Sequence, residues 1–336
     1  MFHKIMSFMG RSTVHPTERA GLKQPGSPAE RRQVLFQLLD DAMSAGARVV
    51  QVRQLDDMVV NRHAALVLKH DVHGLNLASL LAFARAEADM GILGSYFFMP
   101  PDHPDTARHY GFSEQVGVMR EIQAMGHEIG LHLDPYFMME FWRAPLRDVL
   151  LRALSAFEQA GISVNSMNMH GNSAHQHKDA NGYGTSFDLF EELARQPDYP
   201  ELKAVDPDSA EVLRTQRVRL ADFGINFWAD MPLWSRQHGY VVTNFVSDNQ
   251  MGRTGKVEVL THKRNANSYD LVAVQRPGSR NRAEGGTRIS CGTASPDFEE
   301  IRSTFPVESD SLVRLFSSAS TLLLPAQFLV HPQFYI

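Results

Sequence analysis

The chain has 336 residues, of which 43% are hydrophobic and 21% are charged, a balance typical of a folded globular protein. Its formal net charge of −5 argues against a protein that binds nucleic acid through a basic surface. The single cysteine, Cys291, excludes an intrachain disulfide and a cysteine-cluster metal site. Histidine is abundant, with 15 copies, and most of them lie between His63 and His177.

Residues 1–30 are predicted to form a flexible N-terminal arm, because residues 10–30 are rich in glycine, proline and polar side chains. No apolar run reaches the roughly 18 residues that a membrane helix needs, and charges soon follow the short apolar start, unlike in a secretory signal. We therefore expect a cytoplasmic protein without stable membrane insertion. Residues 31–336 are expected to form a single domain with a loop-rich insertion near residues 250–320.

Apolar patterns predict alternating strands and helices after the arm. The expected strands are 64–68, 95–99, 129–133, 162–169, 225–229, 241–246 and 322–330. A first helix is expected to begin near Arg31, and further helices are expected at 77–88, 118–125, 146–157, 187–195 and 312–318. Glycines at 91, 126 and 161 end three of these helices. Their even spacing indicates repeated strand–helix units, which imply parallel strands with right-handed crossovers.

Two kinds of parallel sheet fit this alternation, an open doubly wound sheet and a closed (β/α) barrel. No Gly-x-Gly-x-x-Gly motif follows the first expected strand, which disfavours a dinucleotide-binding sheet. We therefore expect an α/β fold with a parallel (β/α) barrel, complete or incomplete.

Imidazoles and carboxylates follow five of the expected strands. They are Asp71 and His73 after the first strand, His132 within the end of the third and Asp134 after it, His170 after the fourth, Asp248 after the sixth and His331 after the last. In a parallel barrel the carboxyl ends of the strands form one rim, where active sites are built. Neutral imidazole is the commonest metal ligand, and a carboxylate beside the metal's water can remove its proton. Asp71 and His73 alternate along one extended segment, so one can serve as base while the other holds a metal.

Single histidines also have an ordinary structural interpretation. His127 follows a helix-ending glycine and could hydrogen-bond locally, while His63, His175 and His177 show no evident partner. Asp134 could simply cap the next helix. The metal-site hypothesis depends on the gathering of histidines at strand ends, which scattered structural histidines would not produce.

Three segments carry a resemblance to a known family. Residues 70–73 read His-Asp-Val-His, residues 94–99 read Gly-Ser-Tyr-Phe-Phe-Met, and residues 126–132 read Gly-His-Glu-Ile-Gly-Leu-His. Together they resemble the polysaccharide deacetylase (NodB-homology) superfamily, also called family 4 carbohydrate esterases, and in particular the deacetylase-like proteins of surface-polysaccharide gene clusters. The similarity covers about residues 64–172, with weaker matches at residues 246–248 and 329–332. It implies a distorted (β/α) barrel of about seven strands, a divalent metal, and hydrolysis of an N-acetyl group on a sugar.

The resemblance also implies roles for single residues. Asp71 matches the catalytic base of the family. His331 matches the histidine of its last motif, which acts as general acid or polarises the leaving group. His132 matches the first metal-binding histidine. His73 stands where the family has a metal-binding aspartate, and Tyr136 stands where it has the second metal-binding histidine.

The Tyr136 departure removes one expected ligand, which His170 or Asp134 could replace. Either the metal site has been rebuilt from His73, His132 and His170, or metal and activity have been lost. Zinc is the expected metal, with cobalt or nickel as alternatives.

Two functions from different classes stay open. The first is a metal-dependent hydrolase that removes an N-acetyl or related acyl group from a sugar or from a nucleotide- or lipid-linked sugar. The second is a catalytically inactive carbohydrate-binding or assembly protein with the same fold. A glycosidase would need two carboxylates about 5–9 Å apart, for which Asp71 with Asp230 or Asp248 could serve. Sugar-stacking candidates are Tyr96, Phe98, Trp142 and Trp234.

Overall fold

The computed structural model describes residues 26–44, 46–61, 65–74, 76–170, 189–193, 215–230, 233–241, 244–248, 256–264, 287–289, 298–306 and 326–336. Most of the expected arm, most of the expected insertion and the expected helix 312–318 lie outside the described residues.

Helices and strands alternate along the first half of the chain, as the apolar pattern predicts. The α-helices are α1 (Pro28–Ser44), α2 (Leu55–Asn61), α3 (Leu77–Asp89), α4 (Pro104–Ala107), α5 (Phe112–Ala124), α6 (Pro135–Phe141) and α7 (Leu146–Gln159), and short 3₁₀ turns are η3 (Val52–Gln54), η6 (Leu220–Phe223) and η7 (Pro332–Phe334). The strands are β1 (Arg48–Val50), β2 (Ala65–Val72), β3 (Ser95–Phe98), β4 (Glu128–Leu133), β5 (Ser166–Met169), β6 (Phe227–Ala229), β7 (Leu233–Ser235), β8 (Gly239–Val241), β9 (Asn244–Ser247), β10 (Lys256–Arg264), β11 (Thr287–Ile289), β12 (Phe298–Pro306) and β13 (Ala326–Val330).

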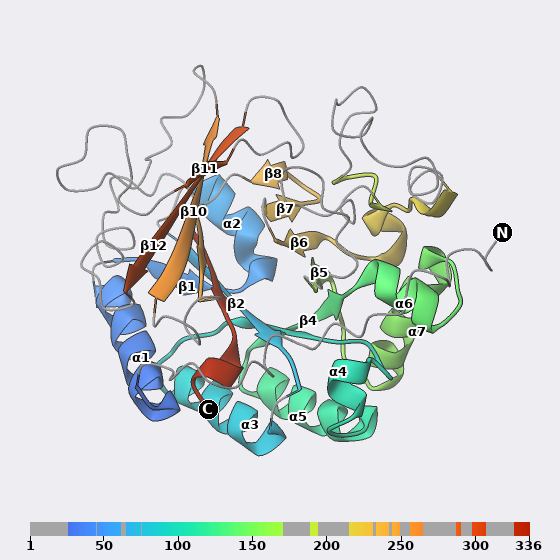
Figure 1. Cartoon of the computed structure of the whole chain (residues 1–336), viewed down its shortest axis with the longest axis horizontal. Helices are drawn as coiled ribbons and strands as arrows, with labels where there is room; N and C mark the ends of the chain where they lie inside the picture. Colours follow the sequence, from blue (N-terminus) through green and yellow to red (C-terminus); the bar gives the residue numbers. More distant parts are fainter. Residues whose placement is uncertain are drawn as a thin grey trace.

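The strands form one curled, mostly parallel sheet, with helices such as α3, α5 and α7 on its outside (Figure 1). Parallel neighbours follow the order β9, β13, β2, β3, β4, β5 and β6, and β1 pairs in parallel with the start of β2. Antiparallel strands extend both ends, with β7 and β8 beyond β6, and β10, β12 and β11 beyond β9. The α/β class is confirmed. No pairing among the described strands joins the two ends of the sheet, so they form a half-barrel rather than a closed one.

The three helix-ending glycines have the backbone conformation that this position requires. Gly91, Gly126 and Gly161 have φ values of 76°, 101° and 70°, in the left-handed region that side chains disfavour. Each returns the chain from a helix to the sheet. The apolar stripe of α7 is likewise buried as expected, through Leu146, Val149, Leu150, Ala153 and Phe157.

The last strand lies in the middle of the sheet. β13 pairs in parallel with β2 on one side, with Val330 opposite His70, and with β9 on the other. All five residues of β13 are buried. This pairing brings the two ends of the domain together and carries His331 to the strand end that bears Asp71.

The first helix begins earlier than expected, at Pro28. Ser27 Oγ accepts a hydrogen bond from the backbone N of Glu30, and Glu30 Oε2 accepts one from the backbone N of Ser27. This capping box satisfies two backbone donors of the first turn, and proline suits the first helical position.

Two other expectations differ from the structure. Residues 189–193 form a bridge from Phe190 to Val218 and a turn instead of a helix. The expected strand 241–246 is divided between β8, which pairs with β7, and β9, which pairs with β13, because the chain changes neighbour within the run. The described part of the expected insertion near residues 250–320 includes β10 and β12, two nine-residue strands paired antiparallel along their full length.

No helix among the described residues has the length and apolar character to cross a bilayer.

Candidate metal centre

Successive side chains at the end of β2 point to opposite faces of the sheet. Asp71 lies on the face that also carries His132 of β4, whose Nε2 is 3.9 Å from Asp71 Oδ2. His70 points the other way, where its Nε2 is 2.9 Å from Glu87 Oε1 and its ring stacks on Tyr96 at 4.1 Å. Both His70 and Glu87 are fully buried. His70 therefore belongs to a structural network under α3. It lies on the other side of the sheet from the site, because successive side chains of a strand point to opposite faces.

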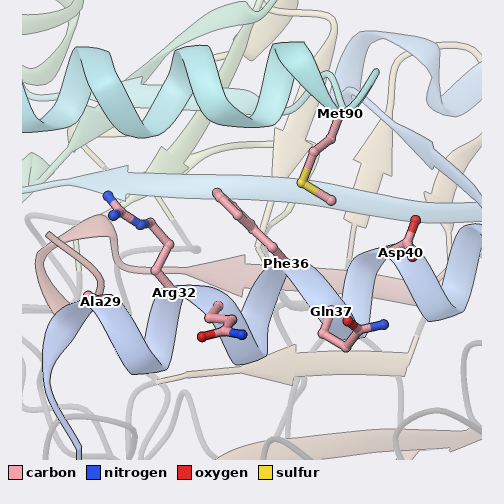
Figure 2. Close-up of a pocket in the computed structure, with 7 residues that line it drawn as sticks. Ala29, Arg32, Phe36, Gln37, Asp40 and Met90 are labelled. Carbon is pink, nitrogen blue, oxygen red and sulfur yellow. The ribbon is translucent and has the colours of Figure 1, made fainter.

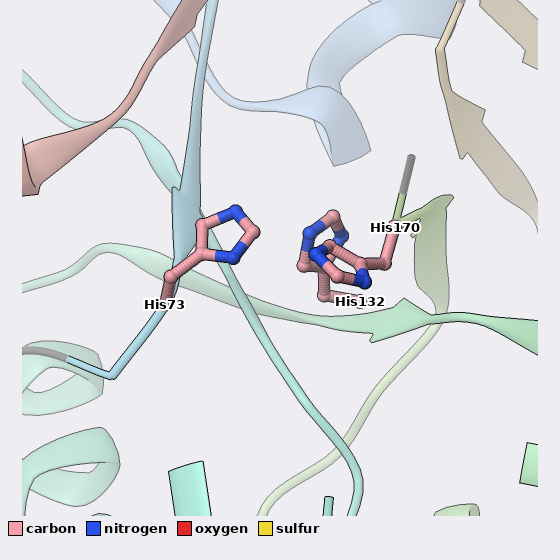
Figure 3. A group of neighbouring side chains, drawn as sticks. All are labelled: His73, His132 and His170. Carbon is pink, nitrogen blue, oxygen red and sulfur yellow. The ribbon is translucent and has the colours of Figure 1, made fainter. Parts of the chain in front are cut away.

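Three histidines converge at this edge, from the ends of β2, β4 and β5. The ring centroids of His73 and His132 are 5.1 Å apart, those of His73 and His170 are 4.9 Å apart, and those of His132 and His170 are 5.1 Å apart. Each offers a nitrogen within 4.8 Å of the other two. Figure 3 shows His73 on one side and His132 with His170 facing it. A divalent ion placed among such nitrogens would have three protein ligands, with room for solvent in a fourth position.

Asn168 determines which nitrogen of His132 is free to bind a metal. Its Nδ2 donates to Asp71 Oδ1 at 2.5 Å, so its Oδ1 is the acceptor for His132 Nδ1, at 2.6 Å. His132 Nδ1 therefore carries the proton, and Nε2 keeps its lone pair. That Nε2 atom is buried and has no hydrogen-bond partner among the described residues. A buried acceptor without a hydrogen bond is costly unless a cation or water meets it, so the donor set fits a divalent metal.

Burial also keeps His132 in the neutral form that binds metals. Its removal from solvent lowers the pKa of His132, and this effect outweighs the opposing influence of Asp71 and Asn168. The imidazole is therefore ready to act as a ligand without first losing a proton.

Asp71 is held as a carboxylate. Burial alone would raise the pKa of Asp71, but its positive neighbours together outweigh this effect. Lys69 contributes most and the histidines of the site contribute less, so the pKa of Asp71 lies well below its ordinary value. Lys69 is completely buried, and its Nζ donates to Ala229 O at 2.5 Å and to Asp230 Oδ1 at 2.9 Å. Lys69 was not among the predicted site residues, although it shares the alternation of residues 69, 71 and 73.

His331 reaches the site from the end of β13 and is fixed by Asp248. Its Nδ1 is 2.5 Å from Asp248 Oδ1, and its backbone N donates to Asp248 Oδ2 at 2.7 Å. Burial lowers the pKa of His331, but the Asp248 carboxylate and then Asp71 more than reverse this, and the net pKa is raised. The ring is thus oriented and readily protonated.

Acidic residues surround His170 on the side away from these groups. His170 Nδ1 is 3.9 Å from Asp134 Oδ2, and His170 Nε2 is 3.9 Å from Asp105 Oδ2. Asp134 Oδ1 also caps α6 by accepting from Phe137 N, as its structural interpretation predicts. Burial, helped by Asp105, raises the pKa of Asp134 to about 7. Asp105 lies in the first turn of α4, which follows β3. It was not among the residues predicted from the sequence, because no periodic pattern marks it.

Several candidates from the sequence lie elsewhere. His127 is structural, since its Nδ1 accepts from Gly94 N and its Nε2 is 2.9 Å from Ala84 O. His63, His175 and His177 lie outside the described residues. Tyr136 lies in the first turn of α6, where it is partly buried and packs against the hydrophobic core.

The sugar-stacking and glycosidase hypotheses find little support. Tyr96, Phe98 and Trp234 are buried in the core, and Arg152 covers the ring of Trp142 at 4.1 Å. Asp230 bonds to Lys69 and to Met169 N, and Asp248 is occupied by His331. These carboxylates hold other groups in place instead of pairing with Asp71.

A surface hollow of about 470 Å³ lies apart from the histidines (Figure 2). It is lined by Ala29, Arg32, Gln33, Phe36, Gln37, Asp40 and Met90, from α1 and the end of α3. None of these residues belongs to the metal-ligand groups.

A scan against protein-family models, a search of curated proteins and a search of solved structures each return no match. The polysaccharide deacetylase resemblance therefore stays a prediction from the sequence motifs.

Proposed function

We propose that the protein is a metal-dependent hydrolase that removes an N-acetyl or related acyl group from a sugar or a sugar-linked intermediate. The observation that carries this proposal is the convergence of His73, His132 and His170 beside an ionised Asp71 and a protonatable His331. A metal site, a base and an acid at one strand edge are the groups that amide hydrolysis requires.

The three histidines would hold the ion. Zinc is the metal we propose, because it accepts nitrogen ligands in a tetrahedral arrangement with one open position, and cobalt or nickel are the alternatives. When bound, such an ion lowers the pKa of a water ligand and polarises an acyl carbonyl.

Asp71 would accept the proton of the attacking water. Its low pKa keeps it ionised at neutral pH, and the Asn168 hydrogen bond fixes the direction of its carboxylate. His331 would donate a proton to the leaving nitrogen. Its raised pKa favours the imidazolium form, and Asp248 holds the ring while the charge changes.

The arrangement of strands supports a distorted barrel of the polysaccharide deacetylase type. Seven parallel strands follow one another in the sheet, and the last strand in the chain pairs with β2, so the last motif meets the first. The sugar substrate is proposed from the motif resemblance alone. If the protein is cytoplasmic, a nucleotide-linked or lipid-linked sugar is a more accessible substrate than a finished polymer.

The test combines metal analysis with an acetate-release assay on N-acetylated sugars and nucleotide sugars. The parent should hold about one zinc per chain, and His132→Ala should lose both metal and activity. Asp71→Asn should keep the metal and lose roughly 10²–10⁴-fold in turnover, the usual contribution of a general base. A parent that holds no zinc, cobalt or nickel at micromolar concentrations would contradict the proposal.

The second candidate is a carbohydrate-binding or assembly protein without activity. It is favoured by Tyr136, which stands where the family has a metal-binding histidine. This candidate predicts sugar binding that is independent of metal. Zinc bound through His132 together with acetate release would exclude it.

A further inference from the structure

His73 belongs to two groups of potential metal ligands, and the proposed function uses only one of them as a metal site. The first is His73 with His132 and His170. The second is His73 with Asp71 and His331, whose ligand atoms also lie within 4.8 Å of one another. The ring of His73 accordingly has neighbours from both groups, including His331 at a centroid distance of 5.7 Å.

Neighbouring groups also define the ligand atoms of the second group. A cation bound there would release the Nε2 proton of His331. Asp248 occupies Nδ1 of His331, so Nε2 is the ring nitrogen left for a ligand. Asn168 donates to Oδ1 of Asp71, which leaves Oδ2 as the oxygen without that bond. A carboxylate oxygen and imidazole nitrogens suit Zn²⁺, and a carboxylate behind a ligating histidine is the usual outer support of such a site.

We propose that Asp71 and His331, beside His73, form a second and weaker divalent-cation position that fills when metal is in excess. A neutral imidazole has one lone pair, so an ion held by His132 and His170 takes the His73 nitrogen and leaves the second ion with Asp71 and His331 as its protein ligands. The second ion therefore has fewer protein ligands than the first. We expect it to bind at least about tenfold more weakly, the loss that follows from weakening one element of a metal site.

Occupation of this position would inhibit the enzyme. The second ion would take the carboxylate that accepts a proton and the imidazole that donates one. This consequence depends on the proposed function, whereas binding of the second ion does not.

The experiment is a zinc titration of metal-free full-length protein by calorimetry. The parent should show two classes of site, a tight one and a weaker one. His331→Gln and Asp71→Asn should each lose the weaker class and keep the tight one, whereas His132→Ala should lose the tight class. His238→Gln is the matched control, because His238 lies 3.8 Å from Asp56 and in neither group, and it should keep both classes.

A single class in the parent at 100-fold excess zinc would overturn the proposal. Survival of the weaker class in Asp71→Asn would also overturn the proposal. Asparagine is nearly isosteric with aspartate, so this variant gives the deciding result if His331→Gln does not fold. An unchanged tight class in His132→Ala would instead contradict the metal site of the proposed function and leave the second position to be judged on its own variants. If the parent releases acetate, excess zinc should inhibit it.

Discussion

Replacing Asn168 by leucine should weaken the proposed metal site without changing a proposed ligand. Asn168 is fully buried and joins His132 Nδ1 to Asp71 Oδ1. Leucine has a similar size, so little cavity forms, but the imidazole N–H and the carboxylate oxygen both lose their partner. His132 could then adopt the other tautomer, with its proton on the nitrogen that faces the metal.

The expected loss follows from this geometry. Removing the outer partner of a ligating histidine costs about 10–100-fold in metal affinity, or about 1.4–2.8 kcal/mol. Two buried polar groups left without partners should also lower the free energy of unfolding of the metal-free protein by about 2–6 kcal/mol.

The assay measures the zinc dissociation constant by competition with a chromophoric chelator, and the unfolding free energy by urea titration of metal-free protein. Asn165→Ala is the control, because Asn165 immediately precedes β5, about 10 Å along the strand from Asn168. A folded Asn168→Leu protein that binds zinc within about twofold of the parent would refute the tautomer argument.

Three further outcomes are expected. The pKa of Asp71 is lower in the folded state than in the unfolded state, so on acidification the unfolded state binds this proton first. Metal-free protein should therefore lose unfolding free energy as the pH falls below about 4, and Asp71→Asn should lose less. Urea titrations from pH 6 to pH 3 measure both. Glu128→Ala should lower the unfolding free energy by about 2–5 kcal/mol, since its buried carboxylate accepts from Ser95 Oγ at 2.6 Å and from Ser166 Oγ at 2.7 Å; urea midpoints equal to the parent would contradict this. Deleting residues 326–336 should give insoluble protein, because β13 pairs with β2 and β9 in the middle of the sheet, and a soluble, folded truncation by circular dichroism would count against that placement.

Local patterns determined the first half of the fold. The apolar stripe of α7 and the glycines after three helices fix where each helix lies and ends, because they depend only on neighbours within a turn or two. The capping box of Ser27 and Glu30 was equally visible in the sequence, and it would have given the correct start of α1. The alternating residues of β10 also carried a strand signal within the expected loop-rich insertion.

The sequence also placed chemically active residues at strand ends, and for His73, His132 and His170 the structure brings them together. The sequence alone could not show whether His70 or Asp71 faces the site, because that depends on which face of β2 is turned toward it. Successive side chains of a strand point to opposite faces, so in the structure His70 lies in the core and Asp71 in the site.

Only the tertiary structure decided which strand lies beside which. The pairing of β13 with β2 brings His331 to Asp71 across most of the length of the chain, and the pairing of β4 with β5 sets His132 opposite Asn168. Buried Lys69 and the Asp248 partner of His331 likewise set the charge of the site through contacts that are distant in sequence. Local periodicity carries no information about such contacts, because strand order is chosen by the burial and hydrogen bonding of the whole sheet.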